Sequence, residues 1–267
     1  MGEPFDLRVV PLASVVPHEE SEPRRVARIV GRLASDTVLG NPPLVAEVDD
    51  RFVLLDGANR ISALRMLDYR YAIVQVVPRE EVRLEMWHHA LLDTTPDRLL
   101  AALTAAPAVH LRPAAEGLPA VHLRPAAEGL CVVGLADGRR YGVLPDRDAH
   151  PFAALNSLVG AYLDRVLVRR TTQPDLAVHP DAAAVVAFPR LHTSDVFGAV
   201  RDGVRLPAGI TRFVVTGRVL LLNAALEPLR SDRPVEELNE WLRGLVAGRR
   251  AEARIRYYPE AVYVLDD

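Results

Sequence analysis

The sequence contains no lysine, and all 32 of its basic residues are arginine. The chain therefore lacks the lysine that the P-loop of nucleoside triphosphatases, the Schiff base of pyridoxal enzymes and the active site of protein kinases require. Any recognition of phosphate must therefore use arginine, backbone N–H groups or a metal ion.

Cysteine is almost absent, and long apolar runs are absent altogether. The single Cys131 excludes an intramolecular disulfide and a cysteine-cluster metal site, so the cytoplasm is the expected location. No apolar run approaches the roughly 20 residues that span a bilayer, and the first residues show no signal-peptide pattern. A length of 267 residues allows one large or two modest domains, and a net charge of −3 is typical of an ordinary globular protein.

The first third of the sequence alternates between apolar runs and amphipathic stretches. Strands are predicted at residues 7–12, 44–48, 52–55 and 72–77. Helices are predicted to begin at Pro23 and at Asn59, whereas residues 82–91 fit either a strand or a helix. This order predicts a compact α/β domain over residues 1–93.

Residues 94–267 are predicted to form a second α/β domain. Hairpins are predicted at residues 131–144 and 210–222, single strands at 185–188, 254–258 and 261–265, and helices at 151–168, 194–202 and 236–246. Residues 107–118 and 119–130 are identical in sequence, which indicates a duplication that lengthens a surface loop. The copying explains the matched His110 and His122 more simply than a metal site does.

The most informative stretch is the junction at Asp56 and Gly57, where an apolar strand stops and a helix begins at once. Glycine lets a ligand approach the backbone closely, and the free N–H groups of a helix start favour phosphate. Asp56 at the end of the strand could hold a metal ion or steer a phosphoryl group. A turn with a purely conformational role is the alternative.

A second candidate is the loop that carries His18 and Glu19 between two prolines, Pro17 and Pro23. A carboxylate held on a stiff loop near Asp56 could deprotonate a hydroxyl nucleophile. The alternative is solvated charge ahead of a helix, where the helix dipole favours it.

Two further candidates combine aromatic, imidazole and guanidinium groups. Trp87 and His88 form an aromatic plate beside an imidazole, although a core tryptophan with a surface histidine fits equally well. Thr211 and Arg212 follow a turn, where arginine is suited to a bidentate grip on a carboxylate or phosphate. A surface salt bridge is the alternative for Arg212.

Taken in order, these motifs resemble those of the free L-serine kinases of the ParB/sulfiredoxin-like superfamily. The motifs are His18-Glu19, Asp56-Gly57-Ala58-Asn59-Arg60, Trp87-His88 and residues 207–213. The resemblance extends from Val10 to the last predicted strand and omits only the duplicated loop. It includes the branch of the family that makes O-phosphoserine for the siderophore staphyloferrin B.

The resemblance implies a ParB/sulfiredoxin-like nucleotide-binding domain and a C-terminal α/β domain that contributes to the serine pocket. It also implies transfer of a phosphoryl group from ATP or ADP to the hydroxyl of free L-serine, with Mg²⁺ as the cofactor. Glu19 would be the catalytic base and Asp56 the second catalytic residue, bound to Mg²⁺ directly or through water. The nucleotide phosphates would bind to Gly57, Ala58, Asn59 and Arg60, and serine would bind to His18, Trp87, His88, Thr211 and Arg212, with Arg212 on its carboxylate.

One departure from the family pattern and one rival function bear on this interpretation. The family usually has histidine where this chain has Asn59, and an amide cannot carry a proton or a charge. The rival is a non-catalytic ParB-like nucleotide-binding regulator or DNA-binding protein, which would need a helix-turn-helix and a basic face. The chain is mildly acidic and has no apolar run that spans a bilayer, so we expect no nucleic-acid and no membrane partner. Sulfiredoxin chemistry is not expected either, because it would need a cysteine in the phosphate turn, where this chain has Ala58 and Asn59.

Overall fold

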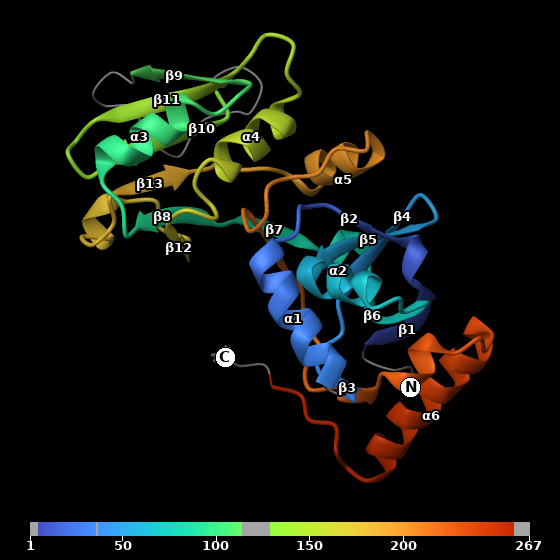
Figure 1. Cartoon of the computed structure of the whole chain (residues 1–267). Helices are drawn as coiled ribbons and strands as arrows, with labels where there is room; N and C mark the ends of the chain where they lie inside the picture. Colours follow the sequence, from blue (N-terminus) through green and yellow to red (C-terminus); the bar gives the residue numbers. More distant parts are fainter. Residues whose placement is uncertain (1–4, 36, 114–128, 259–267) are drawn as a thin grey trace.

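Two β-sheets with helices around them make up the fold of the computed structural model, which describes residues 5–35, 37–113 and 129–258 (Figure 1). The first sheet has the strand order β1-β6-β4-β5-β2, and the second has the order β12-β8-β13-β10-β11-β9. The α+β class predicted from the sequence is confirmed. No helix in the described part of the chain is long and apolar enough to cross a bilayer.

The first sheet is mixed, since β1–β6 and β4–β5 pair antiparallel while β4–β6 and β2–β5 pair parallel. Its strands are β1 (Asp6–Pro11), β2 (Val15–Pro17), β4 (Leu44–Val48), β5 (Arg51–Asp56) and β6 (Tyr71–Val77). Helices α1 (Pro23–Ser35) and α2 (Ala58–Met66) pack against each other, and their apolar residues share one core cluster with Leu54.

Both faces of β5 are buried, because successive side chains of a strand point to opposite sides. Leu54 faces α1 and α2, whereas Val53 and Leu55 belong to a cluster shared with the second sheet. The end of β5 at Asp56 therefore lies where the two halves of the molecule meet.

The second sheet is antiparallel throughout. Its strands are β8 (His88–Leu92), β9 (Val109–Pro113), β10 (Cys131–Leu135), β11 (Arg140–Pro145), β12 (Leu167–Thr171) and β13 (Ala184–Ala187). Helices α3 (Pro96–Thr104), α4 (Pro151–Gly160) and α5 (Thr193–Arg201) contribute to the same core. The 3₁₀ helices are Leu12–Ser14, Arg79–Glu81, Leu176–Val178 and Glu227–Arg230.

Two short antiparallel pairs and one helix bring the end of the described chain back to its beginning. Strand β14 (Thr211–Val214) pairs with β7 (Arg83–Met86), and β15 (Ala224–Ala225) pairs with β3 (Val38–Leu39). Helix α6 (Val235–Ala251) then packs on β1 (Figure 1), where the Asn239 amide exchanges hydrogen bonds of 2.9 and 2.8 Å with the backbone of Val9.

Three predicted elements are wrong, and distant partners explain two of them. The helix predicted over 151–168 ends at Gly160, because residues 167–171 pair with β8 as an edge strand. The hairpin predicted over 210–222 does not form, since β14 pairs with β7 instead. Residues 254–258 form no strand, and residues 261–265 lie outside the described residues. The ambiguous stretch 82–91 contributes β7 and β8.

The predicted domain boundary at residue 93 stays a prediction, as does the ParB/sulfiredoxin-like assignment of the first domain. The two sheets do not separate at residue 93, because each includes or packs against residues from the other side of that boundary. Strand β8 lies before residue 93 and belongs to the second sheet. Residues such as Leu222, Leu238 and Leu242 lie far after it and pack in the core of the first sheet.

Candidate active site

The loop that follows β2 carries His18 and Glu19 to the end of β5. His18 is fully buried, and its Nδ1 lies 2.5 Å from the carbonyl oxygen of Leu54. Since a carbonyl only accepts, Nδ1 carries the hydrogen and donates it. The other ring nitrogen, Nε2, lies 2.8 Å from Oγ1 of Thr211. His18 thus joins the end of β5 to the start of β14.

The carboxylate of Glu19 is held from two directions. Its Oε2 accepts the N–H of Gly209 at 2.9 Å and lies 3.4 Å from Oγ1 of Thr211. The backbone on either side of it pairs with Leu206, through hydrogen bonds of 2.8 Å that involve His18 and Glu20. The segment that leads into β14 therefore fixes both the backbone and the side chain of Glu19.

Burial is the main cause that raises the pKa of Glu19 above its usual value, and the charge of Asp56 adds to it. His18, the N–H of Gly209 and Arg170 act in the opposite direction without cancelling the rise. A carboxylate with a raised pKa is a stronger base than a solvated one. The environment thus makes Glu19 suited to accepting a proton.

Gly209 contacts Glu19, His89 and Arg170, and its backbone conformation requires glycine. Its φ is +75°, and an added Cβ would collide with the guanidinium of Arg170. Its carbonyl accepts a hydrogen bond of 3.1 Å from Nε2 of His89, whose Nδ1 in turn lies 2.8 Å from the hydroxyl of Tyr162. This buried chain of contacts keeps the N–H of Gly209 directed at Glu19.

Asp56 and Gly57 form the junction between β5 and α2, as the sequence predicts. Gly57 has a φ of +101° and is the N-cap of α2. Its carbonyl accepts the N–H groups of Arg60 and Ile61 at 2.9 Å, so the N–H groups of Ala58 and Asn59 precede the first hydrogen bonds of the helix. A Cβ on Gly57 would lie 3.1 Å from Cβ of Pro43. The turn can therefore present its backbone to a ligand, as phosphate-binding turns do.

The pKa of Asp56 is shifted in the opposite direction from that of Glu19. Burial acts to raise its pKa, but Arg218, Arg60 and the N–H of Gly57 together outweigh burial and hold the pKa below its usual value. The carboxylate is paired directly with the guanidinium of Arg218 and is half exposed. Asp56 is therefore ionised across the physiological range.

Asn59 connects the two halves of the site. Its Oδ1 accepts the backbone N–H of Glu22 at 2.8 Å, and the carboxylate of Glu22 pairs with Arg170 at 2.5 Å. The first turn of α2 therefore holds the loop that carries Glu19. A neutral histidine also offers an acceptor nitrogen, so asparagine can preserve this contact although it cannot carry a proton.

The structure brings three of the predicted site residues into contact and places Arg212 apart from them. His18, Glu19 and Thr211 are in mutual contact. Thr211 and Arg212 are neighbours on β14, so their side chains point to opposite faces. The guanidinium of Arg212 lies 5.0 Å from the ring centroid of Trp87 and binds Glu85 at 2.9 Å.

His88 follows Trp87 and is the first residue of β8 in the second sheet. Burial lowers its pKa to about 4, so it is neutral near pH 7. Its Nδ1 accepts the backbone N–H of Phe188 at 3.0 Å. The proton of the neutral ring is therefore on Nε2, which remains as its donor.

Sequence reasoning missed three residues that complete the site, namely Gln75, Arg170 and Arg218. Gln75 carried a signal, since it is the one polar residue within the apolar strand 72–77. Arg170 and Arg218 carried none, because each resembles many other arginines in the sequence. Their partners, Glu22 and Asp56, are 148 and 162 residues away along the chain.

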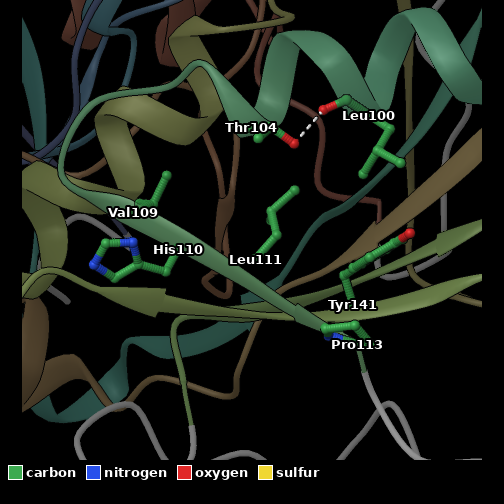
Figure 2. Close-up of a pocket in the computed structure, with 7 residues that line it drawn as sticks. All are labelled: Leu100, Thr104, Val109, His110, Leu111, Pro113 and Tyr141. Atoms are coloured by element: carbon green, nitrogen blue, oxygen red, sulfur yellow. Dashed lines mark hydrogen bonds between the residues drawn. The ribbon is translucent and has the colours of Figure 1, made fainter.

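A separate hollow lies at the other end of the second sheet. Figure 2 shows its lining residues, Leu100, Thr104, Val109, His110, Leu111, Pro113 and Tyr141. They gather around β9 and β11, whereas β12 and β8, which carry Arg170 and His88, form the opposite edge of the sheet. His110 pairs with Asp146 at 2.7 Å, and His122 lies outside the described residues. The hollow is therefore separate from the site around Glu19.

Comparison with solved structures places this arrangement in the fold of the free serine kinases. A free serine kinase variant in complex with AMP has a TM-score of 0.73 at 14% identity, covering 85% of this chain and 95% of that one. A C-terminally truncated SbnI from Staphylococcus aureus has a TM-score of 0.71 at 23% identity, covering 91% and 97%. At these identities the likeness concerns the fold.

In sequence, the chain is similar to the ATP-dependent L-serine kinase SbnI of Staphylococcus aureus. The two are 24% identical over 262 residues, which is 97% of each chain. An ATP-dependent L-serine kinase of Staphylothermus marinus is 27% identical over 88 residues, 32% of this chain and 35% of the relative. No family model matches. The resemblance to free serine kinases predicted from the motifs is confirmed.

Proposed function

We propose that this protein is a kinase that transfers a phosphoryl group from ATP or ADP to the hydroxyl of free L-serine, giving O-phospho-L-serine. The observation that carries the proposal is the position of Glu19, a largely buried carboxylate with a raised pKa near a phosphate-type turn with an ionised Asp56. Similarity along 97% of the chain to an L-serine kinase supports it.

In the proposed reaction Glu19 is the general base. The oxygen of the serine hydroxyl bonds to the terminal phosphorus of the nucleotide while its proton passes to Glu19. The bond from that phosphorus to its bridging oxygen breaks, and the electron pair leaves with ADP, or with AMP when ADP is the donor. The hydrogen bond from Gly209 fixes one carboxylate oxygen, so the other is available for the proton.

Phosphoryl transfer depends mainly on positioning and on neutralising charge. We propose that the turn from Gly57 to Arg60 binds the nucleotide phosphates through the first N–H groups of α2 and the guanidinium of Arg60. Arg60 already acts electrostatically on Asp56 from within this turn. The turn can therefore serve phosphate without a lysine.

Mg²⁺ is part of the proposal, and the residues present fit a metal that arrives with the nucleotide. No cluster of three or more acidic, histidine or cysteine side chains is found in the described part of the chain. Mg²⁺ is commonly held by one or two carboxylates and by substrate phosphates, and the ionised, half-exposed Asp56 meets that need. When bound, the ion would neutralise charge on the phosphates.

For the serine pocket we propose His18, Trp87, His88 and Thr211, with an arginine on the substrate carboxylate. The sequence points to Arg212, whereas the geometry favours Arg170, which lies against Gly209 and acts on Glu19. Both guanidinium groups already pair with a carboxylate, Arg170 with Glu22 at 2.5 Å and Arg212 with Glu85 at 2.9 Å, but Arg212 lies on the face of β14 opposite to Thr211. We therefore take Arg170 as the first candidate and Arg212 as the second.

A matched pair of variants decides between the two arginines. Removing the partner of the substrate carboxylate should raise the KM for serine by roughly 30-fold or more and leave the nucleotide KM nearly unchanged. We expect this for Arg170→Ala and a small effect for Arg212→Ala. A large rise in the serine KM for Arg212→Ala and a small one for Arg170→Ala would instead assign the substrate carboxylate to Arg212.

The proposed function is tested by incubating the protein with Mg²⁺, ATP or ADP, and a panel of free amino acids. Phosphorylated products are identified by mass spectrometry. We expect O-phospho-L-serine from L-serine and little product from D-serine or L-threonine. Binding of nucleotide without any phosphorylated amino acid would instead favour the non-catalytic regulator.

We also propose a cytoplasmic location, where ATP is available, and a role in supplying O-phosphoserine to siderophore biosynthesis. The pathway follows from the resemblance alone. Deleting the gene in its host should lower siderophore output, and added O-phospho-L-serine should restore it. Unchanged output would assign the product to another pathway.

A further inference from the structure

A buried amide fixes the backbone on both sides of Arg218. Gln75 lies on β6 and is 3% exposed. Its Nε2 donates to the carbonyl of Gly217 at 2.9 Å, and its Oε1 accepts the N–H of Val219 at 2.8 Å. An amide that uses both its donor and its acceptor on the two neighbours of one residue determines where that residue projects.

The residue so placed pairs with Asp56, the carboxylate of the phosphate turn. The pair is accessible to a ligand, because the side chains of Arg218 and Asp56 are 30% and 50% exposed. An open pair of this kind is held weakly compared with a buried one. The guanidinium can therefore change partner while Gln75 keeps its backbone in place.

The charges of the site make such a change of partner favourable. A nucleotide brings several negative charges to a turn that already contains the ionised Asp56. A guanidinium beside that turn can form two parallel hydrogen bonds with a phosphate as readily as with a carboxylate. A divalent cation that accompanies the nucleotide would favour the carboxylate that the guanidinium leaves.

We propose that Arg218 is a nucleotide-binding residue that exchanges partners: it neutralises Asp56 when the site is empty and binds the nucleotide phosphates when Mg²⁺ and nucleotide enter. Gln75 is the positioning residue for this exchange. The inference rests on the proposed function, since it assumes that nucleotide binds at the turn after β5.

The exchange predicts a specific pattern of affinities for ATP and ADP. Arg218→Ala should weaken binding of either nucleotide by roughly 10- to 100-fold, the usual effect of losing a hydrogen bond to a charged group. Asp56→Asn should strengthen binding of metal-free nucleotide, because Arg218 is released and a repulsive charge is removed. Asp56→Asn should also abolish most of the gain in affinity that Mg²⁺ brings to the wild type.

A double variant separates a direct contact with phosphate from simple neutralisation of Asp56. If Arg218 contacts the phosphates, Asp56→Asn with Arg218→Ala should bind metal-free nucleotide roughly 10- to 100-fold more weakly than Asp56→Asn alone. If Arg218 only neutralises Asp56, the two should bind equally, and that equality would overturn the inference.

The affinities are measured by isothermal titration calorimetry with ATP and with ADP, in EDTA and in excess MgCl₂. Arg139→Ala is the matched control and should leave every affinity unchanged, because Arg139 pairs with Asp97 of α3 and with Asp137 in the turn between β10 and β11. Gln75→Leu should reproduce part of the Arg218→Ala effect on nucleotide and leave the KM for serine unchanged. An unaltered nucleotide affinity in Gln75→Leu would remove the positioning role.

The outcomes distinguish this inference from the proposed function. If the wild type binds neither ATP nor ADP, the proposed function and the exchange both fail. If the wild type binds nucleotide and phosphorylates serine while Arg218→Ala binds nucleotide as well as the wild type does, the function stands and the exchange is wrong.

Discussion

The surroundings of Glu19 and Asp56 prepare these two carboxylates for different tasks. Burial and the neighbouring negative charge raise the pKa of Glu19, whereas Arg218, Arg60 and a backbone N–H overcome burial at Asp56 and lower its pKa. Titratable groups whose environments separate their pKa values in this way are typical of acid–base assignments in enzymes. The proton acceptor is therefore expected to be Glu19, and Asp56 is expected to remain charged.

At this scale, Glu19→Gln should lower turnover by roughly 10²- to 10⁴-fold, because an amide cannot accept the serine proton. Nucleotide binding should persist, since the glutamine oxygen can still accept the N–H of Gly209. Steady-state kinetics and calorimetry measure the two effects. Glu20→Gln is the matched control, because the side chain of Glu20 is exposed and pairs with Arg205 at 3.3 Å. More than a tenth of the wild-type turnover in Glu19→Gln would exclude Glu19 as the base.

The same substitution should change stability in a pH-dependent way. A carboxyl whose pKa is higher in the folded than in the unfolded state binds its proton more tightly when folded, so the protein loses stability as pH rises from the ordinary value of 4.5 through the raised value. Glu19→Gln lacks this loss. We expect the variant to be more stable than the wild type at pH 8 and the difference to shrink toward pH 4.5, measured by urea unfolding. A difference that grows as pH falls would contradict the raised pKa.

At the scale of elements, local patterns could be predicted from the sequence and distant pairings could not. The junction of β5 and α2 follows from an apolar run, an Asp-Gly pair and a helical period, all within ten residues or so. Residues 167–171 and 211–214 form strands whose partners, β8 and β7, lie more than seventy residues away. Arg170 and Arg218 reach the site through the same long-range pairings, which explains why the sequence pointed to Arg212 instead.

The duplicated segment supports a prediction about an element. Strand β9 comes from the first copy, and the last residue of the second copy, Leu130, is buried at the start of β10. Deleting residues 119–130 leaves the first copy intact and puts the identical Leu118 directly before β10. We expect soluble protein with nearly unchanged unfolding free energy and activity, because shortening a loop changes its closure entropy only slightly. Loss of soluble expression would show that the second copy is needed for folding.

At the scale of the whole molecule, the last helix of the described chain packs against its first strand. Helix α6 covers β1, and its buried residues Leu238 and Leu242 join the core cluster of the first sheet. The segment between β14 and α6 carries Arg218 across to Asp56 on the way. The turn at Asp56 and Gly57 thus receives a side chain, Arg218, from more than 150 positions later in the sequence.

This closure predicts that α6 matters for global stability. Leu242→Ala should lower the free energy of unfolding by about 2–5 kcal/mol, the usual range for a buried leucine reduced to alanine. The exposed Arg243→Ala on the same helix should change it by no more than about 0.5 kcal/mol. Denaturant titration measures both. Equal, small effects would mean that α6 is not part of the cooperative core.

The central claim, that this chain phosphorylates free L-serine with Glu19 as its base, is tested most directly by phosphorus NMR. The wild type and Glu19→Gln are each incubated with L-serine, ATP or ADP, and Mg²⁺, and the resonance of O-phospho-L-serine is followed over time. We predict steady formation by the wild type and at least a roughly 100-fold slower rate for Glu19→Gln. No O-phospho-L-serine from the wild type, or equal rates from both proteins, would contradict the account.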